Sequence, residues 1–334
     1  MATTNIQLLC PVDGDLVPGA ASTSEQGRGS QSQRARTWLA SFIAVGAAIF
    51  VPLIVGLRVD YSSFLPLLGL PLALIPCGFY LHRRALSDLL GAVEGVALVI
   101  VLAVPILILS YAAMRLNLPL ADARLAGWDD ALGLNAMTVV KNVGNSPWLA
   151  SGLGISYSSF SLQLLAIPPL LMLTGQTARG YWFVEAFLIG CIVSIAISAF
   201  FPALGSYVHF ALDAKAAGAV NPFFGYHFLE SFDAVRGDPD FVLSLGDASG
   251  IVTFPSIHAA TAVFCGYAAW SARALRIPFL VLNIAMFASA ITHGAQYFVD
   301  VAAGGIVALL VILLRGPASA GCEVALAGRR TDTG

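Results

Sequence analysis

The sequence predicts an all-α membrane protein, built as a polytopic bundle of about eight transmembrane helices. The first observation is composition: 58% of the 334 residues are apolar and only 11% are charged, whereas soluble domains carry roughly 25% charged residues. The second is that the apolar residues form long runs, and a helix needs about 20 of them to cross a bilayer. A membrane protein of this composition is not expected to bind nucleic acid, and the formal net charge of −2 leaves no basic or acidic tail to interpret.

The chain opens with a polar segment, residues 1–36, that is rich in Ser, Gly, Gln and Arg. Such a composition buries too little apolar surface to fold, so we predict a disordered cytoplasmic tail. The segment lacks the short apolar core of a secretory signal. Residues 316–334 are predicted to form a second cytoplasmic tail.

Eight apolar segments follow the first tail, and each is a predicted span. We assign the first three to an accessory region, 37–118, and the other five to a membrane domain, 119–315. Pro66, Pro71 and Pro76 are expected to distort the second span, where neighbouring helices must satisfy the freed carbonyl groups. The eight segments are 38–57, 64–82, 90–113, 148–174, 181–203, 255–272, 277–294 and 297–315.

Basic residues orient these spans, because Lys and Arg concentrate on the cytoplasmic side of a membrane. With the amino terminus inside, eleven of the 17 Lys and Arg residues fall in inner segments and six in outer ones. We therefore predict an inner or plasma membrane protein with both termini in the cytoplasm. Two outer loops, 114–147 and 204–254, are too long to be simple connectors, and we expect them to fold over the outer face.

Four ionisable residues lie in or beside the apolar runs of the carboxy-terminal half: Glu185, His258, His293 and Asp300. Charged groups inside a membrane are costly, so each is a candidate for function. Glu185 follows a Tyr-Trp pair near the inner end of its span, and we expect it to reach the interface instead.

The stretch that leads to His258 has the features of a phosphate site. Pro255 suits the first position of a helix, and a helix start offers free N–H groups and the positive end of the helix dipole. Such a start binds anions, Ser256 adds a hydroxyl group, and His258 in the first turn can donate a proton to a leaving oxygen. The alternative is a capped helix start with an interfacial histidine and no chemistry.

A second stretch, at the start of the last span, completes the candidate site. Gln296 and Asp300 are four residues apart and share a helix face. Two short spans carry the chain in and back out, so His258, His293, Gln296 and Asp300 are expected to converge on the outer side. His293 is too far from Asp300 along a continuous helix, unless Gly294 breaks it. The alternatives are an interfacial histidine and a carboxylate that only complements the helix dipole.

Arg236 lies in the second outer loop and is a candidate phosphate clamp, although a solvated loop charge is the alternative. Weaker candidates are polar residues of the loops and spans, of which Tyr157 and Gln163 are expected to bond between helices. The five cysteines are scattered, and no residues show metal-ligand spacing or a nucleotide-binding glycine loop. No metal and no cofactor is expected. The other weak candidates are Arg124, Lys141, His209 and His227.

At these residues the chain resembles the type 2 phosphatidic acid phosphatase superfamily, and most of all its inositol phosphorylceramide synthase or inositolphosphotransferase-like branch. The matching stretches are Phe-Pro-Ser-Ile-His-Ala-Ala at 254–260 and His-Gly-Ala-Gln-Tyr-Phe-Val-Asp-Val-Ala-Ala-Gly at 293–304. Weaker likenesses extend the resemblance over residues 119–310. It implies a helical core of the phosphatidic acid phosphatase kind, a phospholipid or other phosphorylated lipid as partner, and a mechanism without metal.

The resemblance also implies roles for single residues. In the family, a histidine four residues before an aspartate attacks phosphorus, the aspartate orients that histidine, and the histidine of the Pro-Ser-x-His stretch protonates the leaving group. Carried over, His258 is the general acid and Asp300 the orienting carboxylate. Ser256 and the neighbouring N–H groups bind phosphate, with Arg236 as a second ligand. The Lys-and-Arg-Pro stretch of the wider superfamily is not visible.

This chain departs from the family at the nucleophile, because position 296 holds glutamine. A carboxamide nitrogen is a very poor nucleophile, and loss of a catalytic nucleophile costs on the order of 10⁶ in rate. Either His293 attacks in its place, or the protein binds lipid without turnover. The sequence thus predicts a lipid-phosphate phosphatase or phosphotransferase at the outer face, impaired by Gln296. The alternatives are a non-catalytic lipid-binding protein and, with less support because no inverted repeat is evident, a transporter.

Overall fold

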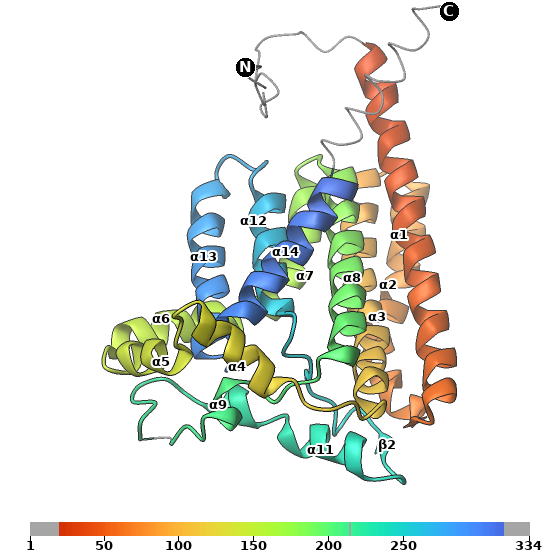
Figure 1. Cartoon of the computed structure of the whole chain (residues 1–334). Coiled ribbons are helices and arrows are strands. Elements are labelled where there is room, and N and C mark those ends of the chain that lie inside the picture. Colours follow the sequence, from red (N-terminus) through yellow and green to blue (C-terminus); the bar gives the residue numbers. More distant parts are fainter. Residues whose placement is uncertain (1–19, 214, 317–334) are drawn as a thin grey trace, which may run out of the picture.

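The structure, a computed structural model, describes residues 20–213 and 215–316, with side chains from residue 29 on. These residues form an all-α bundle whose long helices run roughly side by side (Figure 1). Five of the described helical segments are long and apolar enough to cross a membrane, and a bent pair makes a sixth. The predicted all-α membrane bundle is confirmed, and the protein is an integral membrane protein. Of the eight spans expected, five or six are supported among the described residues. The five segments are Gly29–Val55, Tyr61–Arg83, Ser87–Arg115, Thr177–Phe200 and Phe298–Arg315.

The bundle helices and the shorter elements fall into two groups. The bundle consists of α1 (Ala20–Val55), α2 (Leu65–Arg83), α3 (Ser87–Arg115), α7 (Phe160–Leu173), α8 (Thr177–Phe200), α12 (Ile257–Ala269), α13 (Arg276–Thr292) and α14 (Phe298–Arg315). The shorter elements are η1 (Tyr61–Phe64), α4 (Asp122–Ala131), α5 (Ala136–Gly144), α6 (Pro147–Ser158), α9 (Ser206–His209), α10 (Phe223–Tyr226) and α11 (Leu229–Gly237), with β1 (Arg58–Val59) paired in parallel to β2 (Val242–Leu243).

The two ends of the bundle differ in their connections. One end, here called the turn end, joins helices by the short segments 84–86, 174–176 and 270–275. The other, the loop end, carries residues 116–146 and 201–256, which form the shorter helices α4, α5 and α9–α11 beneath the bundle in Figure 1. The two long predicted loops therefore do fold over one end. Helices α12 and α14 begin at this loop end, and α13 ends there (Figure 1).

Each predicted span is helical, but the fourth is not straight. The segment 148–174 bends by 53° between α6 and α7, and α6 lies beside α5 across the loop end (Figure 1). At the bend the Ser159 hydroxyl donates to the Ser156 carbonyl at 2.6 Å, a bond that competes with the helix ladder and favours bending. Helices α12 and α13, with 13 and 17 residues, are also shorter than a full span of about 20 residues.

The amino-terminal part differs from the predicted disordered tail over 1–36, because α1 already begins at Ala20. Its polar residues have partners on other helices: Arg34 pairs with Glu94, and Gln33 donates to Glu185. The Thr37 hydroxyl donates to the Tyr181 carbonyl at 3.1 Å. These tertiary bonds stabilise helix in a segment whose composition alone does not. Residues 1–19 and the predicted tail from 317 on lie outside the described residues.

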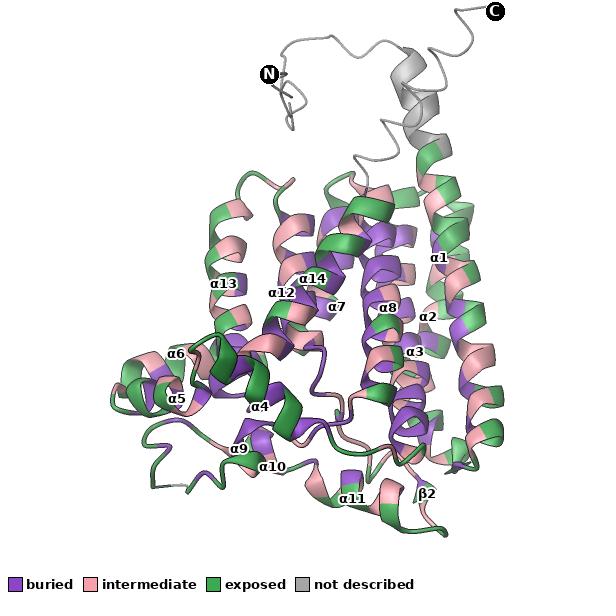
Figure 2. Ribbon diagram, viewed as in Figure 1, coloured by how far each residue is buried: buried purple, intermediate pink, exposed green. Residues whose placement is uncertain are grey.

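Helix α8 lies at the centre of the bundle and is the most buried of the spans (Figure 2). It packs against α1 and α3 on one side and against α7, α12 and α14 on the other. Gly190 permits a close approach of α12, since a Cβ atom there would lie 2.7 Å from the Phe264 ring. Helix α8 therefore connects the first three helices of the chain with the helices that begin or end at the loop end.

Candidate functional site

The start of α12 offers unused hydrogen-bond donors. Ser256 is the N-cap: its hydroxyl accepts the Ala259 N–H at 3.0 Å, and its own N–H donates to the Asp300 carbonyl at 3.0 Å. Among the described residues, the N–H groups of Ile257 and His258 have no partner. Two free N–H groups at the positive end of a helix can bind an anion, so the start of α12 stays a candidate phosphate site.

Aromatic rings hold the half-buried His258 side chain at this helix start. The Tyr157 ring stacks on the imidazole, with 4.2 Å between centroids and 7° between planes. The Phe160 ring lies at 4.4 Å. The bend between α6 and α7 brings both rings to one histidine. Because stacking uses the faces of the imidazole, both nitrogens stay free for proton transfer.

The chain breaks between α13 and α14, as the prediction for His293 required. Helix α13 ends at Thr292, His293 is its C-cap, and Ala295 has a φ of +53°. The His293 Nδ1 atom lies 3.0 Å from the Thr292 hydroxyl. Its Nε2 atom faces Gly154, where a Cβ atom would lie 3.1 Å away. Burial lowers the pKa of His293, so its imidazole is neutral at pH 7.

Gln296 and Asp300 are buried beside this break, and each has one unpartnered oxygen. One Asp300 oxygen accepts the Tyr297 N–H at 2.9 Å, whereas Oδ1 has no partner. The Gln296 amide donates to the Thr253 carbonyl at 3.3 Å, and Oε1 has no partner. Neither side chain bonds to a histidine. Buried polar atoms without partners are uncommon, and each needs an explanation.

Two aspartates of α4 that were not among our predicted site residues hold the break in place. Asp122 accepts the N–H groups of Leu204 and Gly205 and, at 3.1 Å, the Tyr297 hydroxyl. Asp129 accepts the first two N–H groups of α14, from residues 298 and 299, at 2.8 and 2.9 Å. Their spacing of seven residues, which places both on one face of a helix, was the available signal.

These aspartates also set the electrostatics of the break. Burial raises the pKa of Asp129, the two α14 N–H groups oppose that rise, and the neighbouring Asp130 adds to it. Burial and then Asp122 raise the pKa of Tyr297, so its hydroxyl stays protonated and donates. Asp129 occupies the start of α14, whereas the start of α12 is left open to an anion.

Other predicted residues lie apart from this cluster. Arg236, on α11, donates to the Leu118 carbonyl at 2.8 Å and lies over the Phe232 ring, and neither contact joins it to α12. Glu185 does not reach the interface as expected. It is buried and accepts bonds from Arg315 and Gln33 towards the turn end, because those partners compensate its charge.

The weaker candidates have ordinary structural contacts. Gln163 bonds between helices as expected, since its side-chain oxygen accepts from Asn283 at 2.8 Å. Arg124 lies over the Phe201 ring, and Lys141 is exposed on α5. The His227 ring bonds to the Phe224 carbonyl, and the His209 ring lies 6.2 Å from that of Tyr297. Within the described ranges, no group of three His, Cys, Asp or Glu side chains has the arrangement to hold a metal ion.

Comparison with known proteins gives one family. The family model described as PAP2 superfamily matches residues 123–314. This range contains nearly all of α4 to α14 and every residue of the cluster around His258 and His293 except Asp122. The comparison with curated proteins gives no match. The comparison with solved structures gives none either.

Proposed function

Because the chain belongs to the PAP2 superfamily, we propose that it is a lipid-phosphate phosphatase or phosphotransferase that uses histidine chemistry within the membrane. The observation that carries the proposal is the start of α12. There, two unpartnered N–H groups lie beside an imidazole that aromatic rings hold in place. This combination can bind a phosphate group and donate a proton to it.

The first step is binding of the lipid phosphate at α12. Its oxygens accept the N–H groups of Ile257 and His258, which the helix dipole makes good anion ligands. Ser256 holds this first turn in shape, because its hydroxyl caps the helix. His258 then donates a proton to the oxygen of the leaving alcohol, a contribution that is typically worth about 10²–10⁴ in rate.

The attacking group is the point where this chain departs from its family. A histidine at position 296 would find in Asp300 a carboxylate with one free oxygen, the partner that orients an attacking imidazole. Gln296 cannot attack, and its amide is bonded to Thr253. In the natural chain we assign slow attack on phosphorus to His293, which is neutral at pH 7 and lies in the break beside Gln296.

A second candidate function is lipid binding without turnover, and Gln296 is the observation that favours it. The phosphate site at α12 needs no nucleophile, so it can retain a phosphorylated lipid when chemistry is lost. The two candidates differ in one measurable way: the enzyme releases inorganic phosphate, and the binding protein does not.

The substrate is proposed to be an amphiphile whose phosphate lies at the interface while its tails stay in the bilayer. We place the loop end on the outer face of an inner or plasma membrane, with both termini in the cytoplasm. Arginines near the turn-end segments support this orientation, namely Arg83, Arg84, Arg179, Arg273, Arg276 and Arg315. The finer proposal, an inositol phosphorylceramide synthase-like enzyme, is supported by the stretch 293–304.

The test is phosphate release from phosphatidic acid by the full chain, purified in detergent. Gln296→His is expected to raise the rate by about 10²–10⁴, because it restores a covalent nucleophile. His293→Ala is expected to remove the slow activity of the natural chain. The matched control is Gln163→His, a second buried glutamine changed in the same way, which should give no gain.

The outcomes separate the candidates. A natural chain that binds phosphatidic acid but releases no phosphate, together with an active Gln296→His variant, supports lipid binding as its present function. If Gln296→His is as inactive as the Gln163→His control, the assignment of position 296 to the nucleophile is wrong. If no variant binds phosphatidic acid, the phosphate site at α12 is wrong.

A further inference from the structure

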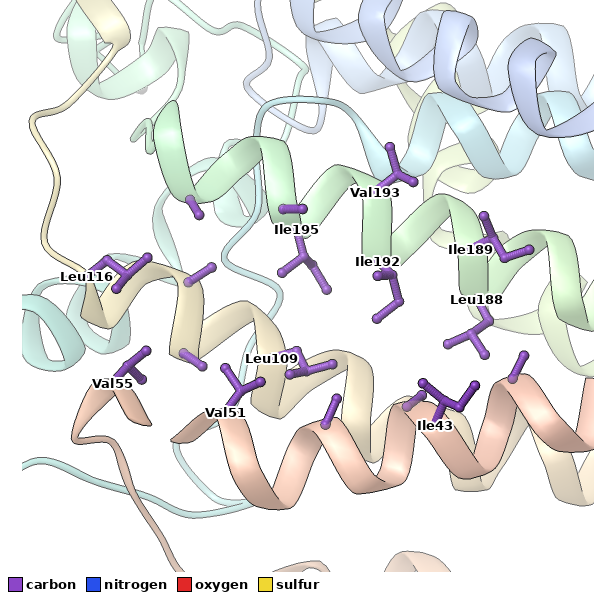
Figure 3. A pocket seen from close by; sticks show the side chains of 17 residues that line it. Ile43, Val51, Val55, Leu109, Leu116, Leu188, Ile189, Ile192, Val193 and Ile195 are labelled. Carbon is purple, nitrogen blue, oxygen red and sulfur yellow. The ribbon is translucent and has the colours of Figure 1, made fainter. Parts of the chain in front are cut away.

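A groove with a volume of about 480 Å³ runs between α1, α3 and α8 (Figure 3). All 17 side chains that line it are Ala, Val, Leu or Ile. Such a surface offers no hydrogen bond and no charge to a ligand, so its occupant is apolar throughout. Several alanines, among them Ala47 on α1 and Ala196 on α8, leave the space between the larger side chains.

The groove extends inwards from the loop end over at least the depth of one bilayer leaflet. It begins at the loop end, where Val55, Leu116 and Ala199 lie at the ends of their helices, and it reaches Ala40 on α1 and Leu188 on α8. At 1.5 Å per residue these stretches measure roughly 17–22 Å. Half of a hydrocarbon core is about 15 Å thick. Along α8 the groove therefore ends near the bilayer centre, whereas along α1 it continues towards the turn end.

Its width fits a single hydrocarbon chain. Spread over a length of roughly 20 Å, the volume corresponds to a channel about 5 Å across. Carbon atoms in contact are about 3.5–4 Å apart, so one extended chain of methylene groups fills this width. A helix with side chains is about 10 Å in diameter and needs about three times the volume. The groove can therefore hold the full width of an acyl chain, whereas a partner helix would place only a row of its side chains there.

We infer that this groove binds one acyl chain of a phospholipid from the leaflet on the loop-end side. One guanidinium group near its mouth suits an anionic head group: Arg236 donates to the Leu118 carbonyl, two residues beyond the lining residue Leu116, and its other terminal nitrogen has no partner among the described residues. The guanidinium of Arg115 is already bonded to carbonyl groups of residues 235, 238 and 239. The lipid is separate from the candidate substrate, because the groove lies between α8 and α1, whereas residues of α6 and α7 contact His258. The inference is independent of the proposed activity.

The bound chain also connects two parts of the protein. One wall belongs to α1, outside the matched family range, and the opposite wall belongs to α8, inside it. Where the groove separates these helices, the acyl chain supplies the packing contacts that side chains do not. The lipid that carries this acyl chain is therefore a structural lipid that stabilises the packing of α1 against α8.

The experiment uses the full chain in nanodiscs of phosphatidylcholine that contain a small fraction of the same lipid with a diazirine halfway along one acyl chain. After illumination, labelled peptides are mapped by mass spectrometry. Labels are expected to concentrate on residues 40–55 and 188–199. Ala196→Phe and Ala47→Phe, which fill the groove from opposite walls, should each lower that labelling at least fivefold. The matched control, Ala73→Phe on the exposed face of α2, should leave it unchanged.

Each outcome bears on the inference. Labelling of the groove that is no stronger than that of α2 overturns it, as does strong labelling that both filling variants leave intact. Cross-links between two copies through α1 and α8 overturn it in favour of a dimer contact. Both positions line an open groove, so the variants should fold. Equal thermal unfolding midpoints in detergent check this, and a variant that unfolds early is replaced by the milder Ala196→Leu.

Discussion

The two ends of the bundle differ at one buried carboxylate: towards the turn end each buried carboxylate is fully bonded, whereas at the loop end Asp122 and Asp129 are and Asp300 is not. Towards the turn end, both oxygens of Glu94 accept bonds from Arg34, and one also accepts the Tyr181 hydroxyl. Both oxygens of Glu185 are also bonded, one to Arg315 and the other to Gln33. These carboxylates lie in the membrane region without an unmet bond, and they join α1, α3, α8 and α14.

At the loop end not every buried hydrogen-bonding group has a partner. Among the described residues, Oδ1 of Asp300 is the one buried carboxylate oxygen without a partner. Gln296 has a free oxygen beside the same break, and the first N–H groups of α12 are free. The comparison teaches that an ionisable group within a membrane does not by itself mark a functional site. A better indication of a candidate site is a buried ionisable group with a hydrogen-bonding atom that no other part of the protein uses.

The largest expected effect tests the loop end. In a Gln296→His background, His258→Ala should lower the rate of phosphate release by about 10²–10⁴, because it removes the proton donor for the leaving group. The measurement is turnover of phosphatidic acid at saturating substrate. His209→Ala is the control, since that ring lies near Tyr297 but outside the α12 start. A double variant as fast as its parent removes His258 from the mechanism.

Substitutions of the bonded carboxylates near the turn end should lower stability and leave the rate of phosphate release unchanged. Glu185→Ala leaves Arg315 and Gln33 without their partner and should destabilise the fold by about 2–3 kcal/mol. This lies below the range for a fully buried pair, because Arg315 is 45% exposed. The measurement is the free energy of unfolding in mixed detergent micelles. If turnover in the Gln296→His background falls while stability does not, the division between the two ends fails.

A smaller effect concerns the aspartate at the start of α14. The folded-state pKa of Asp129 is raised, so the folded protein binds this proton more readily than the unfolded chain. The free energy of unfolding of the natural chain should therefore rise as pH falls from the folded-state pKa of Asp129 towards the ordinary Asp value near 4. Compared with the Asp129→Asn variant, the rise should be at most about 1.4 kcal/mol per pH unit. Unfolding of both proteins across this window measures it, and a constant difference contradicts it.

The smallest effect is expected at an exposed pair. Arg58 and Asp240 lie 3.0 Å apart, but their side chains are 60% and 91% exposed. Arg58→Ala should change the free energy of unfolding by less than about 0.5 kcal/mol, since water screens such a pair. Thermal unfolding at low and high salt measures this. A large loss of stability that depends on salt would contradict this and show that the exposed ion pair also stabilises the loop end.

The sequence predicted which segments are helical more readily than where those helices begin and bend. The eight apolar segments are all helical, and the stretch at 254–258 does begin a helix with Ser256 as its cap. The bend at Ser159 and the helical start at Ala20 were not predicted. The helical start depends on contacts with distant residues, such as Arg34 with Glu94, which local composition does not encode. The bend is accompanied by a local bond, from the Ser159 hydroxyl to the Ser156 carbonyl, that the hydropathy of the segment does not show.

The sequence by itself determined that this protein is a membrane bundle, because hydropathy is a property of each segment and a run of about 20 apolar residues crosses a bilayer as a helix. It also determined the residue types of the site, including the glutamine at 296. Only the tertiary structure decided which charges are satisfied: it gave Glu185 two partners and left Oδ1 of Asp300 without one. The reason is physical, since a hydrogen bond depends on atoms brought together from distant parts of the chain, and its geometry exists only once the helices have packed.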